Sequence, residues 1–186
     1  MTIASYAELV SELGDWLNRT DLSAKIPTFI RLFEARMNRR LRAPDMEQTF
    51  TLTTVAGTLS YALNARVRSL REVYIETSAD IDATAYTVTG ESIVFNDDPG
   101  EVTLVYTAYS TLPALGTGQA TNWLLDDHPD LYLFGSLARA EAYLKDDDRL
   151  AVWKSAEDEA LSEVIREANE KRLPAGPLQM QPSVIE

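Results

Sequence analysis

The chain has 186 residues and no cysteine, which excludes disulfide bonds, thiolate metal sites and a cysteine nucleophile. Its 29 acidic and 17 basic residues give a net charge of −12. Affinity for nucleic acids comes mainly from lysine and arginine, so this balance argues against a protein whose task is to hold DNA or RNA. The apolar content of 45% is sufficient for a hydrophobic core in a chain of this length.

The N-terminal segment MTIASYAELVSELGDW lacks the basic start and the continuous apolar run of a signal peptide. The chain also lacks the roughly 18 consecutive apolar residues that a membrane-spanning helix requires. We therefore expect a soluble protein that stays outside the secretory route and contacts no membrane.

Two helices are predicted in the first 44 residues, before the composition changes to segments rich in β-branched and aromatic residues. Ser5 and Glu8 have the spacing of a capping box, which predicts a helix over residues 5–18. A second helix is expected from near Pro27, because proline is tolerated in a first turn and apolar residues then recur at helical spacing as far as Leu41. The side opposite this apolar stripe carries a basic strip of Arg31, Arg39 and Arg42.

A β region is predicted after Pro44. Glycine and proline turn signals separate short segments rich in β-branched and aromatic residues that often alternate with polar ones. The segments are MEQTFTLTT, TLSYALN, REVYIET, AYTVTG, ESIVFN and EVTLVYTAY. They predict a small antiparallel sheet folded into a sandwich or a barrel.

The C-terminal third is predicted to return to helix. Residues 130–144 are apolar on nearly all sides, as in a helix surrounded by protein, and residues 148–172 are amphipathic. The last residues, 173–186, contain three prolines and a glycine and are expected to be extended. This arm carries apolar side chains without a local place to be buried, and its proposed contact residues are Leu173, Pro174, Leu178, Met180, Val184 and Ile185.

These elements predict an α+β fold, in which a bundle of about four helices carries an inserted antiparallel β lobe and ends in an extended arm. The expected divisions are residues 1–44 with 120–172 for the bundle, 46–112 for the β lobe and 173–186 for the arm.

The only histidine, His128, lies among Asp126, Asp127 and Asp130. Imidazole and carboxylate ligands together suit zinc or manganese, so a metal-dependent hydrolase is one interpretation. However, Asp126, Asp127 and His128 are consecutive and point in different directions, and their spacing matches no common ligand pattern. We favour a structural role, with Asp127 as a helix N-cap, Pro129 in the first turn and Asp130 near the positive end of the helix dipole.

The run Asp146, Asp147 and Asp148 is interpreted in the same way, with Asp148 as the N-cap of the last helix. The sequence contains no phosphate-binding P-loop, no dinucleotide-binding GxGxxG and no GxSxG nucleophile motif. We therefore expect no enzymatic activity and no cofactor.

The basic strip has three interpretations: a solvated face partly neutralised by Glu34, a nucleic-acid contact, or a contact with an acidic neighbour. Against a net charge of −12 we favour the third, and the neighbour could be another copy of the chain because residues 121–170 are acidic. The acidic candidates for such a contact are Asp146, Asp147 and Glu157. Glu157 falls inside the apolar stripe of the last helix. It either reaches water at the helix edge or is buried with a partner such as Arg139 or an arginine of the second predicted helix. A lone catalytic carboxylate is the interpretation we favour least, because acid–base catalysis usually needs a second positioned group.

One long segment resembles a known family, most densely over residues 106–153: YTAYSTLPALGTGQATNWLLDDHPDLYLFGSLARAEAYLKDDDRLAVWKSAEDEAL. It is similar to the C-terminal half of head-to-tail adaptors, or connectors, of tailed bacteriophages of the podovirus type. That family often has a tyrosine-rich last strand, an LPAL turn, TNWLL and HPDLYLYGAL; here Phe134 stands where tyrosine is common. The N-terminal IPTFIRLFEARMNRRLR also resembles the second helix of the family. The matching positions are Tyr106, Tyr109, Leu112, Pro113, Asn122, Trp123, Leu124, Leu125, Pro129, Leu131, Tyr132 and Leu137.

The resemblance implies a structural virion protein of the neck, assembled in the host cytoplasm. It implies a homo-oligomeric ring, usually a dodecamer, that joins the portal protein to the tail nozzle or tube protein and lets genomic DNA pass without specific binding during ejection. In such adaptors the C-terminal arm packs against the portal. The alternatives are a neck or tail-completion protein that binds the end of the tail tube, and the metal-dependent hydrolase around His128.

Overall fold

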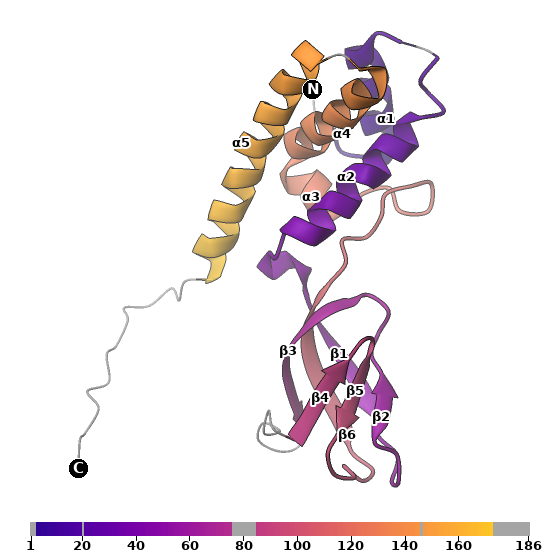
Figure 1. Ribbon diagram of the computed structural model, residues 1–186, viewed down its shortest axis with the longest axis vertical. Helices are drawn as coiled ribbons and strands as arrows, with labels where there is room; N and C mark the ends of the chain where they lie inside the picture. Colours follow the sequence, from indigo (N-terminus) through magenta and orange to yellow (C-terminus); the bar gives the residue numbers. More distant parts are fainter. Residues whose placement is uncertain (1–2, 20, 76–84, 146, 173–186) are drawn as a thin grey trace, which may run out of the picture. The chain divides into compact units, whose positions relative to one another are not determined.

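The computed structural model describes residues 3–19, 21–75, 85–145 and 147–172 (Figure 1). The predicted arm, residues 173–186, lies outside the described residues. The chain divides into two compact units, which we call the helical unit (Met1–Pro44 with Ala114–Glu186) and the β unit (Asp45–Pro113). Each unit is described by itself below.

The helical unit contains five helices in its described part, one more than the four segments predicted. They are α1 (Tyr6–Leu17), α2 (Ile26–Arg40), α3 (Trp123–Asp127), α4 (Pro129–Leu144) and α5 (Asp147–Arg172). The additional helix is α3, which is only five residues long and begins where the Asn122 side chain accepts a hydrogen bond from the Leu125 N–H at 3.0 Å. None of the described helices is long and apolar enough to cross a membrane.

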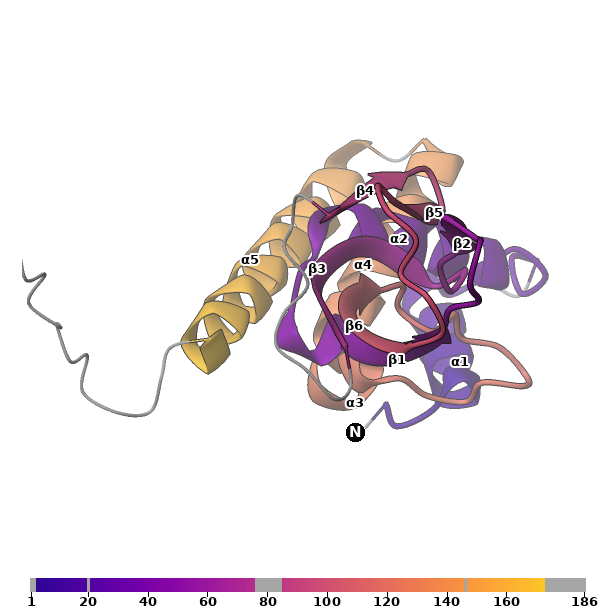
Figure 2. The same ribbon diagram turned by 90° about the horizontal axis from the view of Figure 1, so that it is seen from below.

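The β unit contains two antiparallel three-stranded sheets, ordered β1-β6-β3 and β2-β5-β4. Figure 2 shows β6 between β1 and β3. The two sheets do not close into a barrel, but they share one hydrophobic cluster that includes Leu63, Val73, Ile93, Phe95, Leu104, Tyr106 and Ala108. The strands are β1 (Glu47–Thr53), β2 (Ser60–Ala62), β3 (Val67–Ile75), β4 (Tyr86–Thr89), β5 (Ser92–Phe95) and β6 (Thr103–Ser110), and the short 3-10 helix η1 (Pro44–Met46) precedes them. The α+β prediction is confirmed.

The helix caps follow the sequence expectation only in part. The Ser5 Oγ accepts a hydrogen bond from the Glu8 N–H at 3.3 Å, while the Glu8 carboxylate accepts one from the Ala4 N–H at 2.7 Å. The assignment of Asp127 as an N-cap is wrong, because α3 incorporates Asp127 as its last residue and His128 occupies the N-cap of α4 without a side-chain cap bond.

The remaining predicted cap residues lie in first turns. Pro129 is at the start of α4, and Asp130 is exposed in the first turn of that helix, where its charge favours the helix dipole. The assignment of Asp148 as an N-cap is wrong, because α5 already begins at Asp147 and Asp148 is its second residue.

Helix α4 forms the centre of the helical unit and contacts α1, α2, α3 and α5. Its apolar sequence is explained by this position, since residues on all its sides are buried. The approach of α2 is close at Gly135, where an added Cβ would lie 2.2 Å from the Phe33 Cδ2 atom. Phe33 also packs against Tyr132, with 4.8 Å between the ring centroids. The absence of a side chain at Gly135 therefore sets the distance between α2 and α4.

We expect the substitution Gly135→Ala to lower the free energy of unfolding by about 1–3 kcal/mol, because the methyl group forces Phe33 out of its site. Gly14→Ala in α1 is the matched control, since its nearest contact would be Ile26 at 3.9 Å. That control should gain up to about 1 kcal/mol from the higher helix propensity of alanine. Urea denaturation of both variants measures the difference, and equal stabilisation of the two would contradict the close approach.

Candidate functional site

Two arginines of the predicted basic strip are exposed, and the third donates hydrogen bonds to backbone carbonyl groups of its own chain. Arg31 and Arg39 are exposed on α2, and within the described residues neither has a hydrogen-bonding or ion-pair partner. The half-buried Arg42 differs, because its Nη1 donates to the carbonyl oxygens of Asn38 at 3.1 Å and Leu41 at 2.7 Å. Arg42 thereby satisfies carbonyl groups at the end of α2. Arg31 and Arg39 are the members of the strip that remain available for a partner.

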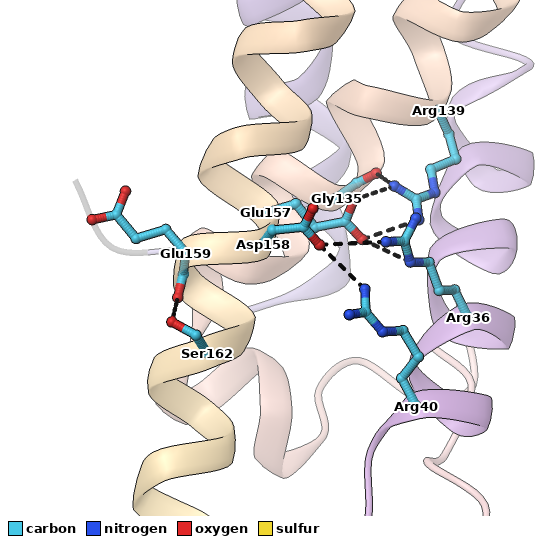
Figure 3. Close-up of polar contacts among 8 residues, drawn as sticks. All are labelled: Arg36, Arg40, Gly135, Arg139, Glu157, Asp158, Glu159 and Ser162. Atoms are coloured by element: carbon cyan, nitrogen blue, oxygen red, sulfur yellow. Dashed lines mark hydrogen bonds and ion pairs between the residues drawn. The ribbon is translucent and has the colours of Figure 1, made fainter.

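The Glu157 carboxylate is fully buried between three helices (Figure 3). It lies on α5 and receives a two-pronged contact from Arg139 of α4, with Nη1–Oε2 at 2.6 Å and Nη2–Oε1 at 3.0 Å. Arg36 of α2 adds its Nε at 3.5 Å from Oε1. The proposal of Glu157 as a residue of an interface between copies is wrong. Its charge is neutralised inside one chain, which is the condition for burying a carboxylate at all.

Asp158, the next residue, forms the exposed counterpart of this buried contact. Its Oδ1 lies 3.4 Å from Nη2 of Arg36 and 3.2 Å from Nη1 of Arg40. The Asp158 side chain is 46% exposed, whereas that of Glu157 is 0% exposed. Both acidic residues therefore form ion pairs between α5 and α2, but the free-energy cost of desolvation is much larger for the buried Glu157 than for the half-exposed Asp158.

A hollow of about 450 Å³ lies beside these ion pairs, between α2, α4 and α5. Four cationic residues line this hollow, which we call the basic groove: Arg36, Arg39, Arg139 and Lys154. Its apolar lining includes Leu32, whose side chain is 54% exposed. Glu157, the acidic residue of the groove, is already paired with Arg139 and Arg36. Arg39 and Lys154, the exposed cations of the groove, have no ion-pair partner among the described residues.

The acidic residues around His128 are not brought together. Asp126 accepts a hydrogen bond from the Thr121 hydroxyl, and His128 Nε2 lies 3.6 Å from Glu167 Oε2, a distance that makes an ion pair when the imidazole is protonated. Among the residues that the structure describes, no three histidine, aspartate or glutamate side chains are grouped as a metal site would require. Asp146 and the side chain of Asp147 lie outside the described part.

A second buried acidic residue, Glu34, joins α2 to the segment that enters α3. Its Oε1 accepts hydrogen bonds from the Leu115 N–H at 2.8 Å and from the Tyr132 hydroxyl at 3.2 Å. The Tyr132 hydroxyl in turn accepts a bond from Asn122 Nδ2 at 2.7 Å. Burial raises the pKa of Glu34, and the bonds from Leu115 and Tyr132 only partly offset this. Burial, followed by the nearby Glu34 carboxylate, also raises the pKa of Tyr132.

Glu34, which one interpretation of the basic strip gives as a partly neutralising charge, is itself buried, with 3% of the residue exposed. The signal for burial was present, since Glu34 follows Ile30 by four residues and precedes Leu41 by seven on the apolar side of α2. The partner of Glu157 was foreseen as one of several arginines. Only the placement of α4 against α5 selects Arg139.

Removal of the buried carboxylate in Glu157→Ala should cost about 3 kcal/mol of unfolding free energy, because Arg139 and Arg36 lose their shared partner. The matched variant Asp158→Ala should cost less than about 1 kcal/mol, because that carboxylate is half exposed. Chemical denaturation at neutral pH compares the two. Equal losses would contradict the distinction between a buried and a surface ion pair.

The variant Glu34→Gln tests the raised pKa of Glu34, because a glutamine Oε1 keeps the acceptor for Leu115 and Tyr132 but carries no charge. A carboxyl group with a raised pKa in the folded state stabilises the protein when protonated, and this contribution is lost as the pH rises above the ordinary value of about 4.5. The stability of Glu34→Gln relative to the natural chain should therefore increase between pH 4 and pH 7. A relative decrease over that range would show that the pKa of Glu34 is lowered instead.

Comparison with known proteins agrees with the adaptor resemblance of the sequence. The family model described as SU10 adaptor protein matches residues 4–181. No curated protein matches the chain. The matched range includes all five helices and all six strands described above, so it covers both compact units. The chain belongs to the SU10 adaptor protein family, in agreement with the phage adaptors that its sequence resembles.

Proposed function

We propose that this adaptor is a non-catalytic structural protein whose copies form a ring between the portal and the tail. The observation that carries the proposal is the family match over residues 4–181. Adaptors of phages are components of the virion neck, where a portal on one side and tail proteins on the other are the partners. Twelve copies, the number implied by the resemblance, would close the ring, and the chain would be assembled in the host cytoplasm.

The exposed arginines of α2 support contact between copies. Arg31 and Arg39 have no hydrogen-bonding or ion-pair partner among the described residues, while the chain as a whole carries a charge of −12. A neighbouring copy supplies acidic surface that these arginines can meet. A ring built from one kind of subunit needs two different faces on each copy, because a self-complementary patch produces only a pair. The acidic residues Asp146 and Asp147 remain candidates for the second face.

The net negative charge also supports passage of DNA without retention. Tight binding of DNA requires many lysine and arginine contacts to phosphates, and the affinity of such contacts would oppose ejection. A channel wall with few available cations lets the duplex slide. In this proposal weak affinity for DNA is a functional property.

The C-terminal arm, residues 173–186, is proposed as the segment that binds the portal. Its apolar residues Leu178, Met180, Val184 and Ile185 would be buried against the partner, and binding would supply the free energy that orders the segment. This part of the proposal rests on the sequence alone.

The purified chain, mixed with the portal protein of the same phage and imaged by electron microscopy, should appear as added density at one end of the portal ring. A chain that ends at Arg172 should lose this density, because the arm is missing, while circular dichroism shows that it stays folded. Failure of the full chain to associate at any salt concentration would remove the portal as partner. Association with the end of the tail tube alone would instead identify a tail-completion protein.

A further inference from the structure

A second hollow, of about 220 Å³, lies between α4 and α5 and has the opposite charge to the basic groove. Asp130, Glu159 and Glu163 line it, and no cationic residue does. We call this surface the acidic flank. Its apolar part is formed by Phe134, Ala156 and Ala160. The acidic flank therefore combines negative charge with a small apolar floor.

The two hollows lie on different sides of the same helix. Lys154 lines the basic groove and Glu159 lines the acidic flank, and these positions are about 140° apart around an ideal α-helix. Figure 3 shows the Glu159 side chain directed away from Arg36, Arg40 and Arg139 across α5. The two hollows thus present cations on one side of α5 and acidic residues on another.

Four charged side chains at the two surfaces lack a partner in the part of the chain that the structure describes. Within the described residues, the side chains of Arg39, Lys154, Glu159 and Glu163 have neither a hydrogen-bonding nor an ion-pair partner, and all four are exposed. Each surface also offers apolar contact, from the 54% exposed Leu32 in the basic groove and from Phe134 in the acidic flank. Charge and apolar contact are complementary between the two surfaces.

We propose that the basic groove of one copy binds the acidic flank of a second copy, with Arg39 and Lys154 facing Glu159 and Glu163. This inference rests on the proposed ring and names the two faces that build it. Because the faces differ, each copy offers one to each neighbour, and the contact repeats around a closed ring. Nucleic acid is a poor occupant of the basic groove, since the acidic flank on the same helix repels phosphate.

Single-cysteine variants test the pairing directly, because the natural chain has no cysteine to interfere. Lys154→Cys mixed with Glu159→Cys should form an intermolecular disulfide under mild oxidation, both at high concentration of the free chain and on the portal. Ser11→Cys, on the exposed side of α1, is the control partner for each variant. Crosslinking of the 154 and 159 pair no faster than the Ser11 control in either state would overturn the proposal.

A charge reversal provides the second arm of the test. Lys154→Glu should weaken self-association by about tenfold or more, because like charges then meet across the interface. The double variant Lys154→Glu with Glu159→Lys restores opposite charges between positions 154 and 159 of neighbouring copies and should recover part of the loss. Association measured by sedimentation that is unchanged in the single variant, or not recovered in the double variant, would overturn the pairing.

Co-sedimentation with portal protein, measured in parallel, separates this inference from the proposed function. Portal binding without the 154–159 crosslink contradicts the interface alone. The crosslink without portal binding supports the interface and contradicts the role at the portal.

Discussion

The burial of the Glu157 carboxylate is the constraint on which the helical unit depends. A buried carboxylate without a cation costs several kcal/mol, so α5 must lie where guanidinium groups reach this position. Arg139 of α4 provides the two-pronged contact and Arg36 of α2 provides a further one. One side chain thereby fixes the rotation of α5 against two other helices. The same rotation decides which residues of α5 face outward on each side.

That rotation produces the surface on which the functional account rests. With Glu157 turned inward, Lys154 lines the basic groove and Glu159 lines the acidic flank. A smaller hollow further along α5 continues the basic side with Arg40, Arg42 and Arg172. The chain is strongly acidic overall, yet four cationic residues line the basic groove on one side of α5: Arg36, Arg39, Arg139 and Lys154. In the proposed ring, this side of α5 contacts a neighbouring copy. Among the described residues, no three histidine, aspartate or glutamate side chains are grouped as a metal site would require.

The sequence was sufficient for the elements with clear periodicity. Helical spacing located α1, α2, α4 and α5, and alternation with turn residues located the strands, because these patterns follow from burial of one face of each element. The short α3 was not predicted, because five residues are too few to show a helical periodicity of apolar positions. Asp127, its last residue, was therefore wrongly assigned as a helix N-cap. Glu157 and Glu34 required the tertiary structure, because the pairing of a buried acid depends on helices distant in sequence. The division of charge between the two sides of α5 needed the same information.

The most direct test of the account is a density map of the adaptor assembled on its portal, at a resolution that shows side chains. The account predicts that Glu159 and Glu163 of each copy lie within ion-pair distance of Lys154 and Arg39 of the next copy, all the way around the ring. A map in which both sides of α5 face solvent or the central channel, with neighbours joined through other surfaces, would contradict it.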